Sequence, residues 1–414
     1  MHICLVSQEY PPETARGGIG TQTWNKARTL ASLGHEVDVL SSATEPGPPL
    51  VSRHEDGINV HRLQPPGFAF PVYEPATFSV GYSWAVLGAF NRLHEGKHFD
   101  LVNFPEYGGE GFAYQVDRTP WSWVPTVVHL HGPLAMFTER IGWPEVDSEH
   151  HHVGTFLEGT SIRLADRLIA SSANIADFAA NYYGVDRDLI DVVHCGIDVD
   201  QFTPRDDGDR PTPPTVLFVG NIAENKGVMT VFEAVLRLRS RYPDLRFRIA
   251  GKGDDDLATD LLRRARDAGA ADLVELVGFV ADRDRLPELY RSATLFASPA
   301  RHEVGVANVY VEAMACGCPV VASVTGGAPE AVTHGESGLL VRPGDVEQTA
   351  AAFERILGDP GLRQSLSRGA RRRVDDYFAT EHYIKRVLDG FERAMERSRE
   401  RLSELTGQPV RGAR

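Results

Sequence analysis

The sequence predicts an α/β protein built from two doubly wound domains. Short apolar runs that suit buried strands alternate with amphipathic stretches that suit helices, which is typical of a parallel sheet covered on both faces. The alternation stops at residues 208–214, where prolines and glycines replace apolar residues, and then restarts. A chain of 414 residues is longer than a single hydrophobic core usually supports, and it has the length expected of two domains.

In the first half, Gly34 ends a predicted helix over 21–33, since glycine commonly follows the last helical turn. The predicted strands are 3–6, 37–40, 101–103, 126–129 and 168–170. In the second half, a helix is predicted over 228–240, and the strands over 216–219, 246–250, 274–276, 295–297 and 320–322.

These elements divide the chain into a first domain over 1–207 and a second over 208–380. A helix over 381–405 is expected to pack back on the first domain, and 406–414 to be a loose tail. Ligands of doubly wound domains bind at the carboxyl ends of the strands, so we expect a ligand between the two domains.

Charge and cysteine usage narrow the class of protein. A formal charge of −14 argues against a nucleic-acid partner, which normally needs a basic face. The four cysteines form no Cys-x-x-Cys pair, which favours a reducing, cytoplasmic setting. The N-terminal strand pattern predicts no signal peptide.

An aromatic-rich stretch over 67–90 contains Glu74 as its single formal charge. Pro71, Pro75, Gly81 and Gly88 are expected to interrupt it, which makes it a poor membrane-spanning helix. We predict that it combines buried packing with an aromatic acceptor cleft. Peripheral contact with a membrane surface is the alternative.

The most informative segment covers residues 300–319. Glu303 and Glu312 bracket a glycine-containing loop, and the run from Glu312 is expected to open a helix that stops at Gly317. A loop that leads into a helix N-terminus binds anions, because unpaired N–H groups and the helix dipole converge there. A diphosphate suits such a site and an adjacent acid suits hydroxyls, so the segment indicates a nucleotide sugar.

A second polar loop, from Gly220 through Asn221 to Lys226, separates a strand from a helix. A lysine at a helix start can meet diphosphate oxygens. An isolated lysine is more often a solvated surface group. Here the chain has only five lysines among its 43 Lys and Arg residues, which favours a specific role.

In the first domain, the loop Arg16-Gly17-Gly18 lets backbone approach a ligand, although its spacing differs from a dinucleotide fingerprint. His131 lies past a strand end, where ligands bind, whereas His129 lies in the strand and is predicted to be structural. The trio 150–152 is predicted to be a loop. The acids at 254–256 favour a helix start over a metal site.

Taken together, these residues resemble the retaining glycosyltransferases of family four, which have the GT-B fold of two Rossmann-like domains facing across a cleft. The resemblance covers nearly the whole chain. Its motifs are Tyr10-Pro11-Pro12 with Gly17-Gly18, residues 193–198, Lys226-Gly227, the segment from Glu303 to Glu312, and residues 325–330.

The resemblance implies a role for each matching residue. Glu312 would hold the donor ribose, Glu303 the hydroxyls of the transferred sugar, and Lys226 the diphosphate. Backbone at Gly305, Val306, Ala307, Asn308 and Val309 would meet sugar and phosphate, Gly18 would close over the phosphates, His131 would lie by the anomeric centre, and Phe279 and Val280 would flank the base. No metal or other cofactor is implied.

Two departures from the family pattern stand out. Eight residues lie between Glu303 and Glu312 where the family usually has seven, and a bulge before Asn308 would absorb the extra one. Asn221 stands where the family commonly has arginine, and we hypothesise that Arg16 or Arg301 compensates for the lost charge.

The function that follows is transfer of a sugar, of hexosyl type, from a nucleoside-diphosphate sugar to a hydroxyl acceptor. The acceptor is a glycan, a lipid or a small metabolite, and anomeric configuration is retained. Two alternatives stay open: a GT-B phosphorylase or epimerase that acts on phosphosugars, and a non-catalytic subunit that binds sugar nucleotides. Base, sugar and acceptor are not fixed by the sequence.

Overall fold

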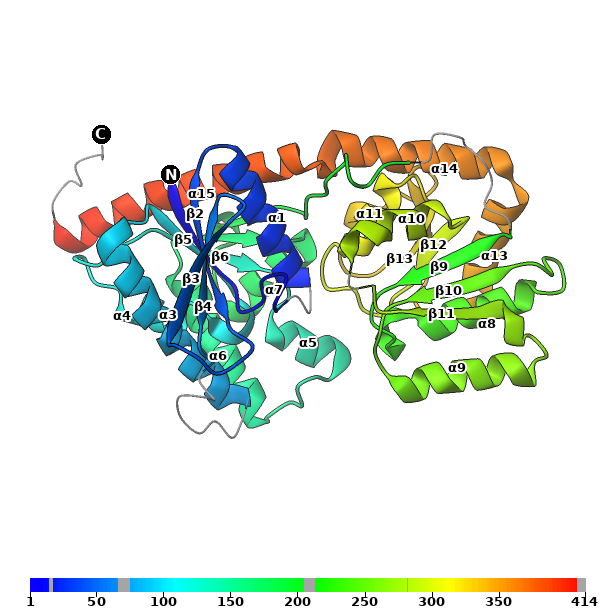
Figure 1. The fold of residues 1–414 in the computed structure, drawn as a ribbon, viewed down its shortest axis with the longest axis horizontal. Helices are drawn as coiled ribbons and strands as arrows, with labels where there is room; N and C mark the ends of the chain where they lie inside the picture. Colours follow the sequence, from blue (N-terminus) through cyan, green and yellow to red (C-terminus); the bar gives the residue numbers. More distant parts are fainter. Residues whose placement is uncertain (15–17, 66–74, 205–212, 281, 408–414) are drawn as a thin grey trace. The chain divides into compact units, whose positions relative to one another are not determined.

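The computed structural model describes residues 1–14, 18–65, 75–204, 213–280 and 282–407. The chain forms two compact units (Figure 1). The first contains Met1–Gly196 and Tyr383–Arg414, and the second contains Ile197–His382. Each unit is built around one sheet, with strand order β3-β4-β2-β1-β5-β6-β7-β8 in the first and β11-β10-β9-β12-β13-β14 in the second.

In the first unit the strands are β1 (His2–Val6), β2 (Glu36–Ser42), β3 (Leu50–Glu55), β4 (Ile58–Leu63), β5 (Leu101–Pro105), β6 (Thr126–Leu130), β7 (Arg167–Ala170) and β8 (Ile190–Val192). Its strands pair in parallel, except that β3 and β4 pair antiparallel. Apolar residues such as Ile3, Val39, Leu101 and Val127 are buried in these strands, because helices cover both faces of the sheet.

The helices of this unit are α1 (Gly18–Ser32), α3 (Pro75–Lys97), α4 (Phe112–Asp117), α5 (Leu134–Ile141), α6 (Glu149–Leu164), α7 (Ala173–Tyr183) and most of α15 (Thr380–Thr406). The C-terminal helix α15, drawn in orange to red, adds Val387 and Phe391 to the core that contains Ile3 and Val127 (Figure 1). The Trp123 indole also donates a hydrogen bond of 2.6 Å to Ser398 on α15.

Two helix predictions in this unit need correction. Helix α1 begins at Gly18, three residues before the predicted start. Helix α3 runs unbroken through Gly81 and Gly88, so the expected interruption there is wrong. A glycine costs a helix only about 1 kcal/mol, and the buried side chains of Tyr82 and Phe90 offset that. Residues 66–74 lie outside the described chain. Among the described helices, none is long and apolar enough to cross a membrane.

The second unit has the strands β9 (Thr215–Val219), β10 (Arg246–Ala250), β11 (Val274–Gly278), β12 (Leu295–Ser298), β13 (Val320–Ser323) and β14 (Gly338–Val341), all paired in parallel. Its longer helices are α8 (Val228–Leu238), α9 (Asp255–Asp267), α10 (Leu286–Arg291), α11 (Asn308–Ala315), α13 (Val346–Gly358) and α14 (Pro360–Arg373). The core packs Phe218, Phe232, Phe247 and Phe353 between sheet and helices.

The division between the units falls at Gly196, before the predicted boundary at 207. Ile197 forms a bridge with Ala379 of the second unit. Arg371 on α14 donates a hydrogen bond of 2.9 Å to the carbonyl of Phe202. Residues 197–204 have neither helical nor strand periodicity, so the sequence pattern did not reveal this attachment. The linker predicted around 208–214 lies mostly outside the described residues.

Candidate active site

The strand order of the second unit reverses between β9 and β12, and open α/β sheets form a crevice at such a switch point. The chain continues from β9 to β10 and β11 on one side, and from β12 to β13 and β14 on the other. The loops that follow β9 and β12 therefore diverge at the carboxyl edge of the sheet, and ligands of open α/β sheets bind at such a point. Lys226 follows β9 and Glu303 follows β12, so both lie at this edge.

Two backbone contacts join these loops. Gly227 adopts a left-handed φ of 79°, and a Cβ there would strike the carbonyl of Pro299. The backbone N–H of Arg301 donates a hydrogen bond of 2.8 Å to the carbonyl of Asn225. Only glycine permits this close approach at residue 227, and the approach brings Lys226 beside the loop that carries Glu303.

The ammonium group of Lys226 lies 3.2 Å and 3.3 Å from the two carboxylate oxygens of Glu303. The side chain of Glu303 is only 8% exposed, whereas that of Lys226 is 33% exposed. The pair thus presents a cation at the surface of the crevice and a carboxylate below it. The first can meet a phosphate, and the second can accept hydrogen bonds from sugar hydroxyls.

A glycine pair holds the Glu303 loop in place. Gly326 has a left-handed φ of 57°, and a Cβ on it would overlap the carbonyl of Glu303. A Cβ on Gly327 would strike the backbone of Gly305. The hydroxyl of Thr325 also donates a hydrogen bond of 3.3 Å to the carbonyl of Ala300. The loop therefore rests directly on glycine backbone.

Glu312 forms a second polar cluster farther along the same segment. Its oxygens accept hydrogen bonds from Arg283 at 2.9 Å and from the hydroxyl of Tyr290 at 2.8 Å. Glu312 is 3% exposed, and Arg283 is about one-third exposed. The expectation that Glu312 opens a helix is wrong, because α11 begins four residues earlier at Asn308. Glu312 is a mid-helix residue whose orientation is set by two partners.

The bulge predicted before Asn308 would lie in the segment between Glu303 and this helix. Residues 301–307 are irregular, and Ala307 is the N-cap of α11, with no side-chain cap. Val306 is buried, while Gly305, Ala307, Asn308 and Val309 are partly exposed. An uncapped helix start presents backbone N–H groups that suit an anion.

The predicted base-flanking residues follow β11. Phe279 is 57% exposed, and the Lys252 ammonium lies 4.9 Å from the centre of its ring. Val280 is partly exposed. Gly220 has a φ of 145°, and its carbonyl packs where a Cβ of Gly251 would lie, so the loops after β9 and β10 touch. Asn221 is exposed at this contact.

Of the two proposed compensating cations, Arg301 lies beside the Lys226 loop. Its guanidinium is 3.8 Å from the Glu224 carboxylate and 55% exposed, so it is accessible to solvent. Arg16 lies outside the described residues.

The first unit carries Gly18 and His131. Gly18 is the first residue of α1, and a Cβ there would meet nothing within 4 Å. The N–H of His131 donates a 2.6 Å hydrogen bond to the buried Glu106, and its ring stacks on that of His129 with centroids 4.3 Å apart. Burial lowers the pKa of His131 to about 3, so its imidazole is neutral at physiological pH.

His129 is buried within β6, so its predicted position in the strand is confirmed. Its Nδ1 lies 3.1 Å from the ammonium of Lys26, which in turn donates a 2.7 Å hydrogen bond to Asn103. Burial lowers the pKa of Lys26 to about 7. This chain of contacts fixes the ring on which His131 stacks.

Glu110, buried in the same unit, gives a pH-dependent prediction. Its carboxyl accepts the Gln8 N–H, and burial raises its pKa to about 8. Between about pH 5 and pH 8 the unfolded chain loses this proton and the folded chain keeps it, so stability falls by up to ~1.4 kcal/mol per pH unit. The melting temperature of Glu110→Gln, compared with that of the parent, should therefore increase as the pH rises. A difference that stays constant with pH, or that the exposed Glu45→Gln reproduces, would contradict this.

Two further sequence assignments meet the structure here. Residues 150–152 belong to helix α6 and not to a loop, because Ser148 caps that helix by accepting the N–H of His151. His151 and His152 bring ring nitrogens within 4.8 Å of a carboxylate oxygen of Asp147. The helix start predicted at 254–256 is confirmed, since Asp254 caps α9.

Comparison with solved structures identifies the fold class of the protein. The structure resembles a sucrose-phosphate synthase from Thermosynechococcus elongatus, with a TM-score of 0.77 and 23% identity over 95% of this chain and 99% of that one. It also resembles Anabaena HepE in complex with UDP-glucose, with a TM-score of 0.72 and 20% identity over 95% and 99% of the chains. The fold is therefore that of the GT-B glycosyltransferases.

Sequence comparison then gives the family. The description "Glycosyltransferase Family 4" matches residues 16–201, and "Glycosyl transferases group 1" matches residues 213–359. A D-inositol 3-phosphate glycosyltransferase from Actinosynnema mirum is 31% identical over 377 residues, which cover 87% of this chain and 89% of the relative. A glycogen synthase from Mycobacterium tuberculosis is 29% identical, with 91% of each chain covered. The chain belongs to glycosyltransferase family four and is a transferase enzyme.

Sequence reasoning missed Arg283 and Tyr290, which hold Glu312. They lie 29 and 22 residues before it, and no motif joins the three positions. The sequence signal that existed was weak: an Arg-Asp-Arg run after a strand, followed by a helix that contains a tyrosine.

Proposed function

We propose that this glycosyltransferase moves a hexosyl group from a nucleoside-diphosphate sugar to a hydroxyl acceptor with retention of anomeric configuration. The observation that carries the proposal is the Lys226–Glu303 pair at the crevice between β9 and β12. A partly exposed cation beside a buried carboxylate offers one group for a diphosphate and one for the hydroxyls of its sugar.

The proposed chemistry is electrostatic. Negative charge grows on the leaving diphosphate as the glycosidic bond breaks, and Lys226 together with the uncapped start of α11 would stabilise it. Glu303 would orient the sugar, and Glu312 would accept hydrogen bonds from the ribose hydroxyls. In the retaining route the acceptor attacks the same face that the diphosphate leaves, and the leaving phosphate takes the acceptor proton.

We propose that no resident metal ion takes part, because Lys226 places the cationic charge where the diphosphate would lie. Arg301, exposed beside the same loop, would add to this charge in place of the arginine that Asn221 replaces. Activity that persists in excess EDTA would support this, and activity restored only by a divalent cation would overturn it.

The activity itself is tested with a panel of nucleoside-diphosphate sugars. The first measurement is the shift in melting temperature that each donor causes, since a ligand that binds the folded state raises it. The second is NMR of the product formed from the best donor, which reads the anomeric configuration directly. An inverted product would refute retention. Sugar release that requires inorganic phosphate and no nucleotide would instead indicate the phosphorylase alternative.

Glu312 gives a specific prediction for donor binding. Glu312→Gln keeps the shape of the side chain but removes the charge that holds Arg283, so the donor Kd should rise by about tenfold to a hundredfold, since each tenfold is about 1.4 kcal/mol. Isothermal titration with the nucleoside diphosphate alone measures it. Glu336→Gln, at an exposed loop position of the same unit, serves as the acid-to-amide control. An unchanged Kd in Glu312→Gln would remove Glu312 from the donor site.

A further inference from the structure

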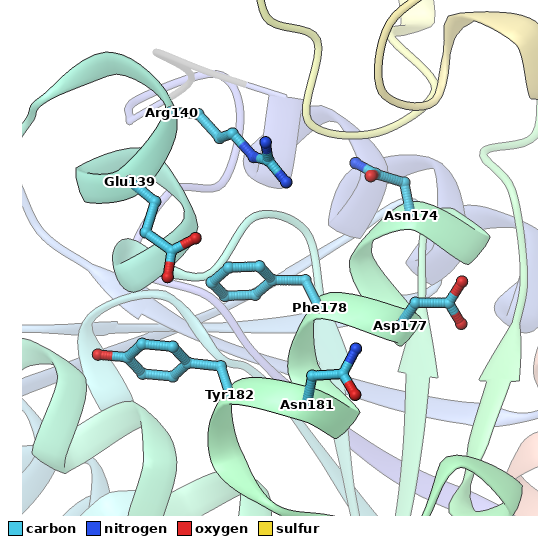
Figure 2. Close-up of a pocket in the computed structure, with 7 residues that line it drawn as sticks. All are labelled: Glu139, Arg140, Asn174, Asp177, Phe178, Asn181 and Tyr182. Carbon is cyan, nitrogen blue, oxygen red and sulfur yellow. The ribbon is translucent and has the colours of Figure 1, made fainter.

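The first unit contains a polar hollow between α5 and α7 that the proposed donor site does not use. Its volume is about 430 Å³, within the ~300–1,000 Å³ range of small-molecule sites. Figure 2 shows Glu139 and Arg140 reaching in from α5 on one side, with α7 on the other. The side chains from α7 are Asn174, Asp177, Phe178, Asn181 and Tyr182.

The contribution of α7 follows from helix geometry. The five residues are spaced at i, i+3, i+4, i+7 and i+8, so they form one face of the helix. Phe178 and Tyr182 stack with ring centroids 5.4 Å apart and planes 12° from parallel. Tyr182 remains 42% exposed. This face therefore combines an aromatic platform with amide and carboxylate groups.

We propose that this hollow binds a neutral sugar, as part of the hydroxyl acceptor. A pyranose ring has an apolar C–H face that packs on an aromatic ring, and its hydroxyls pair with planar amide, carboxylate and guanidinium groups. Phe178 and Tyr182 supply the platform. Asn181, Glu139 and Arg140 supply planar hydrogen-bonding groups around it (Figure 2). The proposal rests on the proposed transferase function for its role and deepens it by naming the acceptor class.

The charge of the lining selects a neutral ligand over a phosphorylated one. Glu139 and Asp177 carry two negative charges, and Arg140 carries one positive charge. Asp177 is also paired with Arg187 at 2.8 Å. In the described part of the chain, Glu139 and Arg140 engage in no ion pair. A phosphate would gain the Arg140 guanidinium but face the Glu139 carboxylate, whereas hydroxyls can pair with groups of either charge.

The test measures sugar binding to the full chain without donor. The probes are maltose and cellobiose as neutral sugars and inositol 1-phosphate as an anionic polyol, each titrated by saturation-transfer NMR. We expect a neutral disaccharide to bind and Phe178→Ala to weaken it by at least tenfold. Phe156→Ala removes a more exposed aromatic ring outside the hollow and should have no effect. If Phe178→Ala fails to fold, Tyr182→Ala, which changes a more exposed residue, is measured in its place.

Three results would overturn the proposal. The first is that neither disaccharide binds. The second is that Phe178→Ala and Tyr182→Ala bind the disaccharide as tightly as the parent does. The third is that inositol 1-phosphate binds and that Arg140→Ala abolishes this binding. Donor turnover distinguishes failure of the sugar-binding proposal from failure of the transferase proposal. With an accepted sugar, Phe178→Ala should raise the acceptor KM and leave slow donor hydrolysis unchanged. Absence of donor binding in the parent would instead refute the transferase proposal, whatever the sugar titration shows.

Discussion

Replacement of Lys226 by alanine should lower kcat by about 10²- to 10³-fold, the usual loss when one preorganised electrostatic group is removed from a transition state. The ammonium group lies 3.2 Å from Glu303 at the carboxyl edge of the sheet, and a third of the side chain is exposed to solvent. The loss should appear in turnover, and the melting temperature should fall as well, because the change leaves the buried Glu303 carboxylate without its cation. Nucleoside diphosphate release from the best donor measures it.

Lys385→Ala is the matched control for this variant. Lys385 is exposed on α15, in the first unit, and is another of the chain's five lysines. It should retain parental turnover. A Lys226→Ala enzyme that keeps more than about a tenth of the parental kcat would contradict the assigned role. The melting curve of Lys226→Ala shows whether a loss of turnover comes from unfolding or from loss of catalysis.

Replacement of Gly326 by alanine should both destabilise the second unit and weaken donor binding. Its φ of 57° costs an alanine about 1–2 kcal/mol. The new Cβ would also overlap the carbonyl of Glu303, so the loop that carries this carboxylate must move. We expect a melting temperature several degrees lower and a donor Kd at least tenfold higher, since a shift of Glu303 also disturbs Lys226.

Gly335→Ala separates the two causes. Gly335 has a φ of 80° and open space where a Cβ would lie, so this variant carries the backbone strain without the contact. It should lose a similar amount of stability from strain and keep the parental donor Kd. Should Gly326→Ala bind donor as tightly as Gly335→Ala does, the glycine does not position the Glu303 loop. Thermal melting and titration with the nucleoside diphosphate give both readings.

The α/β alternation was readable because buried parallel strands are short apolar runs bounded by glycine and polar residues. β10 was predicted to its end residues, and β9 and β12 to within one residue. The strands that escaped prediction include β3, whose burial pattern is mostly exposed, and the three-residue β8. Such strands have too few buried positions to give a period. α3 escaped for the opposite reason, since packing kept it helical through two glycines.

The site residues likewise divide into those that the sequence revealed and those that it did not. Lys226, Glu303 and Glu312 stood out in sequence because each follows a strand in a glycine-containing loop or lies on the helix after it. Their partners did not, because Arg283 and Tyr290 reach Glu312 across an intervening strand and loop. The polar hollow of the first unit was equally hidden. It depends on two helices about 35 residues apart in the chain.

The sequence by itself determined the two α/β domains, the transferase family and the loops that carry charge, since these depend on local periodicity and on residue types at strand ends. Tertiary structure alone decided three further points. It paired Lys226 with Glu303 across the crevice, it placed Glu312 in mid-helix against Arg283 and Tyr290, and it set the Glu303 loop on Gly326. Each is a contact between distant segments, and strand order, which local sequence does not encode, brings such segments together.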